Sequence, residues 1–177
     1  MNHIRIIEYT SAHQPYFEKF NRQWIEKHFV MEPVDEFVLT NPEEAILKPG
    51  GAILMAECDG EIAGTVGLRK VDAVTYEFTK MAVDEKFRRR GIAEKLSYAS
   101  FSKAKELGAR KVILYSNTKN AEAIKLYEKI GFRHLRVEPG VYERANVKME
   151  IDINDVTRSA DMNDLPGNKS IKNLIFN

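Results

Sequence analysis

Residues 75–108 read TYEFTKMAVDEKFRRRGIAEKLSYASFSKAKELG, and the rest of the chain is organised around this stretch. Its first nine residues are rich in β-branched and aromatic side chains, which is typical of a strand. Alternation places four side chains on one face of that strand: Glu77, Thr79, Met81 and Val83. From residue 92 the apolar spacing becomes that of an amphipathic helix, which Gly108 can end as a C′ residue. The stretch therefore predicts a strand, a short loop and a long helix.

The loop between this strand and this helix contains the triplet Arg88-Arg89-Arg90, followed by Gly91-Ile92-Ala93. A helix N-terminus has unpaired N–H groups and the positive end of the helix dipole, and small residues let a phosphate approach those groups closely. The arginines add positive charge. We therefore predict a pyrophosphate-binding cradle at this loop. The alternative is an ordinary strand-to-helix turn with solvated arginines.

Composition limits the classes of protein that fit this chain. A length of 177 residues predicts one domain with a substantial core. The 27 Lys and Arg residues balance 26 Asp and Glu residues, which gives no electrostatic reason to expect nucleic acid or an anionic membrane as a partner. The single cysteine, Cys58, excludes an internal disulfide and fits a reducing compartment. The four histidines lack metal-ligand spacing, so we expect no metal.

The hydropathy pattern bears on location. No apolar run is long enough to span a bilayer, and the N-terminal residues lack the hydrophobic region of a signal peptide. We therefore expect a cytoplasmic protein that has no membrane partner.

Periodicity and turn residues divide the rest of the chain into elements. Ser11 is expected to cap a first helix, Pro33 to interrupt the chain, and Asn41-Pro42 to open a short helix within an irregular segment. Asp59-Gly60 predicts a hairpin turn. The predicted strands span 3–9, 52–57, 61–69, 75–83, 111–116, 132–137 and 146–153, and the predicted helices span 14–28, the stretch from 92, and 120–130. We expect one domain over residues 1–153 and a polar tail over 154–177 that docks on its own domain or on a partner subunit.

Two motifs resemble those of one enzyme family. Arg88-x-x-Gly91-x-Ala93 resembles the Arg/Gln-x-x-Gly-x-Gly/Ala signature of the GCN5-related N-acetyltransferases (GNAT). Residues 120–132, NAEAIKLYEKIGF, resemble the family's Asn-x-x-Ala-x-x-x-Tyr-x-x-x-Gly-Phe motif. Both stand in the family's order and context, and the resemblance covers about residues 3–153.

The resemblance implies an α+β fold in α/β/α layers. A mixed, mostly antiparallel sheet of six to seven strands would be flanked by helices, with a splay between the fourth and fifth strands, 75–83 and 111–116. Acetyl-CoA would be the co-substrate and would lie in this splay. The implied acetyl-CoA-binding residues are Met81, Ala82, Val83, Arg88, Arg89, Arg90, Gly91, Ile92, Ala93, Asn120 and Tyr127.

The chemistry of acetyl transfer suggests roles for two of these side chains and their neighbours. An amine must lose its proton before it attacks a thioester, and Glu77 resembles the family's general base. Its alternative role is a strand glutamate paired with Lys80 or Arg69. Tyr127 resembles the acid that protonates the departing CoA thiolate, and its alternative role is a core tyrosine. A strand N–H near Met81 or Val83 can stabilise the oxyanion, so direct transfer requires no metal and no covalent enzyme intermediate.

The sequence indicates less clearly which residues bind the acceptor, the amine that receives the acetyl group. Candidate contacts are Lys27, His28, Tyr142, Arg144 and Asn146. Arg144 can grip a carboxylate bidentately, which favours an amino acid or related metabolite. We therefore predict an N-acetyltransferase acting on a primary amine of a small molecule. The alternatives are acetylation of protein N-termini or lysines, and a CoA-binding sensor or assembly module without turnover. Dimers are common in the family, so the resemblance also implies a homodimer.

Overall fold

The computed structural model describes residues 2–140 and 142–156. Its strands are β1 (Ile4–Glu8), β2 (Ala52–Cys58), β3 (Glu61–Lys70), β4 (Thr75–Val83), β5 (Lys111–Ser116), β6 (Arg133–Leu135) and β7 (Val147–Asp152). Its α-helices are α1 (Gln14–His28), α2 (Pro33–Thr40), α3 (Ile92–Glu106) and α4 (Ala121–Ile130). The predicted tail lies outside the described residues from residue 157 onward.

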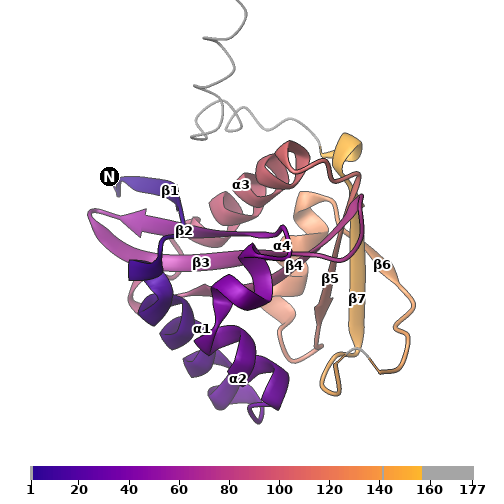
Figure 1. The fold of residues 1–177 in the computed structure, drawn as a ribbon, viewed down its shortest axis with the longest axis horizontal. Helices are drawn as coiled ribbons and strands as arrows, with labels where there is room; N and C mark the ends of the chain where they lie inside the picture. Colours follow the sequence, from indigo (N-terminus) through magenta and orange to yellow (C-terminus); the bar gives the residue numbers. More distant parts are fainter. Residues whose placement is uncertain (1, 141, 157–177) are drawn as a thin grey trace, which may run out of the picture.

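The strands form one seven-stranded sheet in the order β1-β2-β3-β4-β5-β7-β6 (Figure 1). Every neighbouring pair is antiparallel except β4 and β5, which are parallel. This parallel pair is short: it runs from Thr75 opposite Lys111 to Glu77 opposite Ile113. Beyond that point β4 and β5 have no paired residues within the described chain, so the predicted splay between the fourth and fifth strands is confirmed.

Helices cover both faces of the sheet. In the view of Figure 1, α3 lies above β2 and β3, while α1 and α2 lie below them. The α3 side holds the larger apolar cluster, which includes the buried side chains of Leu96 and Phe101. The other side holds a second cluster around Phe17 and Leu39. The predicted layered α+β architecture is therefore confirmed.

A β-bulge in β4 changes which side chains share a face. In the strand register Thr65 lies opposite Ala82 and Gly67 lies opposite Thr79. The two residues Lys80 and Met81 of β4 are therefore matched by the single residue Val66 of β3. Lys80 takes the left-handed conformation, with φ +53°. An extra residue in one strand shifts the in-and-out alternation of its side chains by one, so the residues after the bulge point to the opposite face from the one that simple alternation predicts.

The prediction that Glu77 and Met81 share one face is wrong for this reason. The hydroxyl of Ser97 on α3 lies 4.0 Å from the Met81 sulfur, so Met81 faces α3. Glu77 alternates with Phe78, which belongs to the α3-side core, and therefore faces the other side.

Three expectations about local structure are corrected. Pro33 does not interrupt the chain but begins α2, where its missing N–H removes no helical hydrogen bond. Ser11 is not the cap: it begins a short 3-10 turn whose N-cap is Thr10, and the Thr10 N–H donates to His13 Nδ1 over 2.9 Å. Strand β6 is shorter than the predicted 132–137, because this edge strand pairs with β7 only from Arg133 to Leu135.

Turn and cap predictions made from glycine are confirmed. Asp59 and Gly60 both have positive φ, 51° and 87°, as a two-residue hairpin requires. Gly131 ends α4 in the left-handed conformation, and the N–H of Phe132 donates to the carbonyl of Tyr127 over 2.9 Å. None of the described helices is long and apolar enough to cross a membrane.

Candidate functional site

A cleft of about 810 Å³ opens where β4 and β5 diverge. It is lined by the end of α1, by β4, by the loop that leads into α3, by the β5–α4 segment and by the loop before β7. The predicted residues that it brings together are His28, Glu77, Met81, Ala82, Val83, Arg88, Arg89, Gly91, Ile92, Ala93, Asn120, Tyr127, Tyr142 and Arg144. Of the predicted site residues, Arg90 and Asn146 are the two that are not part of this lining.

The entrance of α3 has the backbone expected of an anion cradle. Gly91 is the N-cap of this 15-residue helix and has φ +77°. Arg89 is also left-handed, with φ +60°. A Cβ built on Gly91 has no heavy atom within 4 Å, so the space beside the first helical N–H groups is open. This opening, together with the positive end of the helix dipole, fits the pyrophosphate of a nucleotide co-substrate.

Arg90 is directed away from the cleft. Its guanidinium lies over the ring of Phe87, 5.2 Å from the centroid, and donates to the carbonyl of Lys86 over 3.3 Å. Arg88 and Arg89 are therefore the two members of the arginine triplet whose side chains border the site. Sequence alone does not separate the three arginines, because all of them are adjacent in the chain.

Glu77 is a buried carboxylate, with 1% of its surface exposed. It lies directly opposite Arg69 on β3, whose Nε donates to Glu77 Oε2 over 2.7 Å. The Tyr142 hydroxyl donates to Glu77 Oε1 over 2.9 Å and lies 3.3 Å from Oε2. The ion pair foreseen as an alternative to catalysis is therefore present, and the same carboxylate also borders the cleft.

Tyr142 approaches Glu77 from the loop before β7. Its ring packs edge-on against Tyr115 of β5, with 5.5 Å between the ring centroids. Burial and the negative charge of Glu77 raise the pKa of Tyr142 above that of an ordinary tyrosine. The phenol is therefore protonated near neutral pH and acts as the donor in its hydrogen bond to Glu77.

Tyr127 is a buried tyrosine on α4 that also reaches the cleft. Its ring packs edge-on against Phe78 and Phe132, at centroid distances of 5.6 and 5.8 Å. Burial raises the pKa of its phenol. Its hydroxyl has no hydrogen-bond partner among residues 2–140 and 142–156, which leaves it able to donate to a bound group. Asn120 stands at the N-cap of α4 without a side-chain capping bond, so its amide is also free of that role.

A second charged cluster lies beside Glu77 and consists of Glu32, Asp35, Lys80 and Arg144; we call it the Asp35 clamp. Asp35 is fully buried and accepts from Lys80 Nζ over 2.8 Å. Arg144 donates to both Asp35 oxygens, over 2.5 and 2.7 Å, and to Glu32 over 2.7 Å. The clamp thus joins α2, the β4 bulge and the loop before β7.

The charges of the clamp are compensated. Burial alone would raise the pKa of Asp35, but the hydrogen bonds from Arg144 and the charge of Lys80 outweigh it and hold this pKa well below its ordinary value. Three N–H groups on the two terminal nitrogens of Arg144 already donate to carboxylates of this chain, so a substrate carboxylate would have to use Nε and the second hydrogen of Nη2. Sequence reasoning missed Asp35 and Glu32 and named Lys80 only as a possible partner of Glu77, because no motif links these distant positions.

Two of the three remaining acceptor candidates, Lys27 and His28, line the cleft at the end of α1. The His28 and Trp24 rings pack at 5.3 Å between centroids, and Lys27 pairs with Glu85 over 3.0 Å. Asn146 accepts from the Thr118 N–H over 2.9 Å, which ties the end of the loop before β7 to the segment after β5. Asn146 therefore fixes the loop and does not line the cleft.

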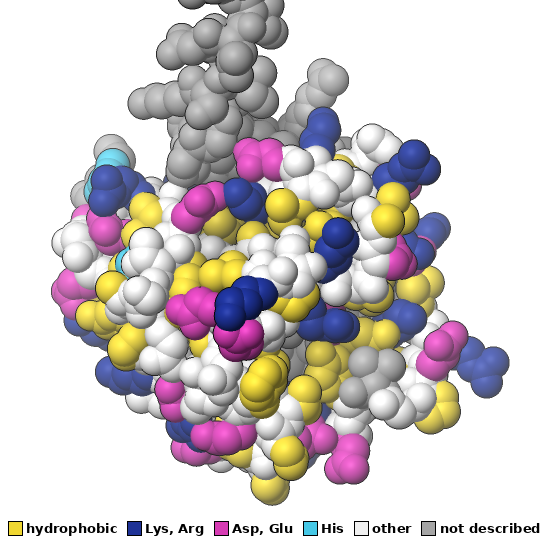
Figure 2. All heavy atoms as spheres, in the orientation of Figure 1, with side chains coloured by type: hydrophobic (Ala, Val, Ile, Leu, Met, Phe, Trp, Pro, Cys, Tyr) yellow, Lys and Arg dark blue, Asp and Glu magenta, His cyan; other side chains and the backbone are white. Residues whose placement is uncertain are grey.

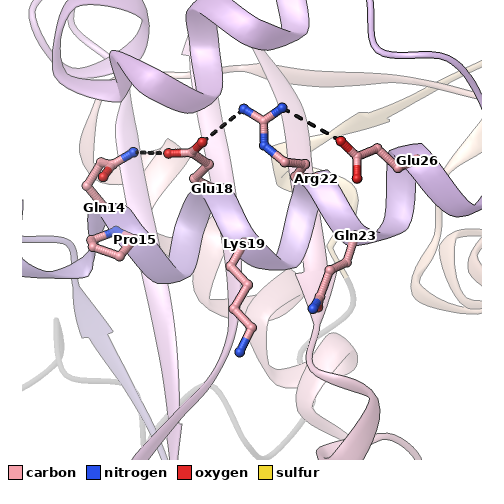
Figure 3. A pocket seen from close by; sticks show the side chains of 7 residues that line it. All are labelled: Gln14, Pro15, Glu18, Lys19, Arg22, Gln23 and Glu26. Carbon is pink, nitrogen blue, oxygen red and sulfur yellow. Dashed lines mark hydrogen bonds and ion pairs between the residues drawn. The ribbon is translucent and has the colours of Figure 1, made fainter.

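A second hollow, of about 340 Å³, lies along the outer face of α1 (Figure 3). Gln14 donates to Glu18 over 2.7 Å, and Arg22 pairs with Glu18 over 2.9 Å. All its lining residues come from one helix, and four of them pair in a row: Gln14 with Glu18, Glu18 with Arg22, and Arg22 with Glu26. On the face drawn in Figure 2, basic and acidic side chains are interspersed and do not gather by sign. The described residues contain no cluster of three metal-ligating side chains.

Comparison with known proteins agrees with this geometry. The family model described as "Acetyltransferase (GNAT) family" matches residues 8–132. The uncharacterized N-acetyltransferase YjgM of Escherichia coli is 32% identical over 91 residues, which are 50% of this chain and 54% of that protein. The chain therefore spans about half the length of this relative.

Solved structures share the fold. An acetyltransferase of the GNAT family from Staphylococcus aureus superposes with a TM-score of 0.77 at 24% identity, covering 85% of this chain and 99% of the other. The acetyltransferase yncA from Salmonella typhimurium, solved with acetyl-CoA, has a TM-score of 0.68 at 18% identity, covering 88% of this chain and 96% of the other.

Proposed function

Because this chain belongs to the acetyltransferase (GNAT) family, we propose that it transfers the acetyl group of acetyl-CoA to the primary amine of a small molecule, most simply an amino acid or related metabolite. The observation that carries the proposal is one cleft in which a helix-end cradle, the unpaired edge of β4, a buried carboxylate and a free phenol meet. Transfer is direct, without a covalent enzyme intermediate.

The cradle is the proposed site of the CoA pyrophosphate. The N–H groups of residues 89–93 would bind it, since Gly91 leaves their approach open and α3 contributes its dipole. Arg88 and Arg89 supply mobile positive charge at the same rim. The edge of β4 from Met81 to Val83 faces the splay without a strand partner, and it can pair with the pantetheine amides. Acetyl-CoA bound there supplies an activated acetyl thioester.

The side chains around the splay handle the protons. Glu77 accepts the proton that the acceptor ammonium must lose before its nitrogen becomes a nucleophile. A β4 N–H near Met81 or Val83 stabilises the negative charge that develops on the carbonyl oxygen. The free hydroxyl of Tyr127 donates a proton to the leaving thiolate.

The Asp35 clamp favours a small acceptor. It ties the loop before β7 to α2 across the acceptor end of the cleft. Phe29, just after α1, lies beneath both Lys119 and Arg144, at 5.3 and 5.8 Å from their charged groups. An extended peptide would need an open groove at this point, and these contacts cross it. We therefore rank protein acetylation below small-molecule acetylation.

The test is release of free CoA thiol from acetyl-CoA with a panel of amino acids, polyamines, aminoglycosides and short peptides. We expect release above hydrolysis with one class of small amine. Turnover with peptides alone would move the acceptor to protein N-termini or lysines. Tight acetyl-CoA binding without release for any amine would contradict transferase activity and favour a CoA-binding sensor.

A further inference from the structure

Glu77 is poorly placed to meet an amine directly. Only 1% of its surface is exposed, and each carboxylate oxygen already accepts a hydrogen bond. Arg69 occupies Oε2 from the β3 side. The Tyr142 hydroxyl lies against both oxygens from the loop that closes the acceptor end. An amine entering the cleft from that end therefore meets the Tyr142 hydroxyl before it meets the carboxylate.

We propose that Tyr142 is a catalytic residue that relays the proton of the acceptor ammonium to Glu77. This inference rests on the proposed acetyltransferase function and adds a group to it. The phenol oxygen accepts a proton from the ammonium nitrogen while the phenol proton passes to Glu77 Oε1 along their hydrogen bond, in which the two oxygens lie 2.9 Å apart. Tyr142 is neutral before and after the exchange, and Glu77 holds the added proton.

The remaining steps balance this transfer. The neutral nitrogen forms the C–N bond to the acetyl carbon as the C–S bond breaks and CoA leaves as a thiolate. The thiolate gains a proton from Tyr127, and the second proton that the nitrogen loses as the amide forms passes through solvent to restore the Tyr127 phenol. Glu77 returns its proton to solvent through Tyr142. The products are the acetylated amine, CoA thiol and one released proton.

The loop that carries Tyr142 is held at three points, which gives the relay a fixed geometry. Arg144, two residues further on, is anchored to Asp35 on α2. The carbonyl of Arg144 accepts from Asn117 Nδ2 over 2.6 Å. The Tyr142 ring itself packs on Tyr115. The Asp35 clamp is therefore a positioning device that holds the phenol against Glu77.

The surroundings of the relay favour transfer toward Glu77 without an ionised tyrosine. The charged or titratable side chains around the Tyr142 hydroxyl come from β3, β4, β5, α2 and its own loop: Arg69, Glu77, Lys80, Tyr115, Glu32, Asp35 and Arg144. Arg69 stabilises the starting carboxylate, while Glu77 opposes loss of the phenol proton. Concerted exchange avoids both a tyrosinate and a second buried charge.

The test compares Tyr142→Phe, Glu77→Gln and the double variant. Tyr142→Phe keeps the ring on Tyr115 and removes only the hydroxyl. Tyr16→Phe, on the exposed side of α1, is the matched control. Two kinds of acceptor are used: an alkylamine from the panel that is protonated at pH 7, and hydroxylamine, which is small and largely neutral at that pH. Thermal unfolding and acetyl-CoA affinity check that each variant is folded and binds its co-substrate.

With the alkylamine at pH 7, we expect each single variant to lose about 10²- to 10⁴-fold in kcat/KM, and the double variant to lose no more than either, since both act on one proton. The difference in kcat/KM between each variant and the wild type should become smaller as pH rises, because the amine then loses its proton in solution. With hydroxylamine, Tyr142→Phe should match the wild type. Fluorinated tyrosines at position 142 should change the alkylamine rate in step with phenol acidity.

Each contrary result has a distinct meaning. Wild-type alkylamine rates in Tyr142→Phe, or equal losses with alkylamine and hydroxylamine, would overturn the relay while acetyl transfer stands. Rates unaffected by fluorination would reduce Tyr142 to a residue that only positions Glu77 and would likewise overturn the relay. Absence of CoA release by the wild type with every amine, hydroxylamine included, would overturn the acetyltransferase function and the relay with it.

Discussion

Two buried carboxylates differ in what surrounds them: Glu77 lines the cleft, and Asp35 is bound to Lys80 and Arg144, which also line it. Asp35 is fully buried and receives hydrogen bonds from two cations, Lys80 and Arg144. Glu77 is almost as buried but has one cation, Arg69, and one neutral phenol, Tyr142. A carboxylate held by two cations stays ionised. A carboxylate that is hydrogen-bonded to a phenol lining the cleft can exchange a proton through that phenol.

The difference assigns different tasks to similar side chains. Breaking a compensated buried pair leaves an unpaired charge, so the Asp35 clamp should matter first for stability. The partner of Glu77, Arg69, has 38% of its side chain exposed and can be solvated when Glu77 becomes an amide, whereas the Asp35 partners Lys80 and Arg144 are 9% and 19% exposed. Glu77 should therefore matter first for rate. Four predictions test this separation.

The largest effect is expected on the rate for Glu77→Gln. The amide still accepts from Tyr142 but cannot take a proton at neutral pH. We expect kcat/KM for a protonated alkylamine to fall by about 10²- to 10⁴-fold, while calorimetry gives an acetyl-CoA affinity close to that of the wild type. Wild-type turnover across the pH range would exclude Glu77 as the base.

The second effect is on stability. Asp35→Asn removes the charge that compensates both Lys80 and Arg144, and we expect the free energy of unfolding to fall by about 3–5 kcal/mol in urea denaturation. Glu36→Gln is the matched control, because the neighbouring Glu36 pairs with Arg22 at the surface and should contribute little. A loss no larger than that of the control would mean that the clamp is not structural.

The third effect follows from the lowered pKa of Asp35. A carboxylate whose pKa is lower in the folded protein contributes stability above its unfolded pKa of about 3.9 and loses it as pH falls toward the folded pKa. The stability difference between the wild type and Asp35→Asn should therefore be full at neutral pH and shrink below about pH 4. If the stability difference between the wild type and Asp35→Asn grew as pH fell, the pKa of Asp35 would be raised in the folded protein and not lowered.

The smallest effect is expected for Tyr127→Phe. A thiolate is a good leaving group even without a proton donor, so we expect kcat to fall by only about tenfold, with thermal stability near that of the wild type. Because the Tyr127 ring packs on Phe78 and Phe132, the phenylalanine should preserve the core. An unchanged kcat would leave Tyr127 as a core tyrosine alone.

Contiguous motifs made much of this fold and site predictable. The strand, loop and helix of residues 75–108 and the motif at 120–132 carry their information within short windows. Local periodicity and glycine positions therefore predicted the strand, loop and helix around the proposed cradle and the ends of α3 and α4, while the splay followed from the family resemblance. Glu77 and Tyr127 followed from the family resemblance, and their positions at the cleft agree with it.

Features that depend on distant contacts were not predictable in the same way. The β4 bulge has no glycine or proline to mark it, so alternation alone put Met81 on the wrong face. The clamp joins residues separated by 45 and 109 positions, and neither interval forms a pattern. Tyr142 was named as a candidate, but its hydrogen bond to Glu77 exists only once the loop before β7 folds over the sheet.

The measurement that tests the account most directly takes the unfolding free energy and the acetyl-transfer rate of Glu77→Gln and Asp35→Asn on the same preparations. We predict a crossed result. Glu77→Gln should keep its stability and lose turnover, while Asp35→Asn should lose stability and keep most of its turnover per folded molecule. If both variants lose stability and rate together, or if Glu77→Gln turns over as fast as the wild type, the division between a reactive and a structural carboxylate is contradicted.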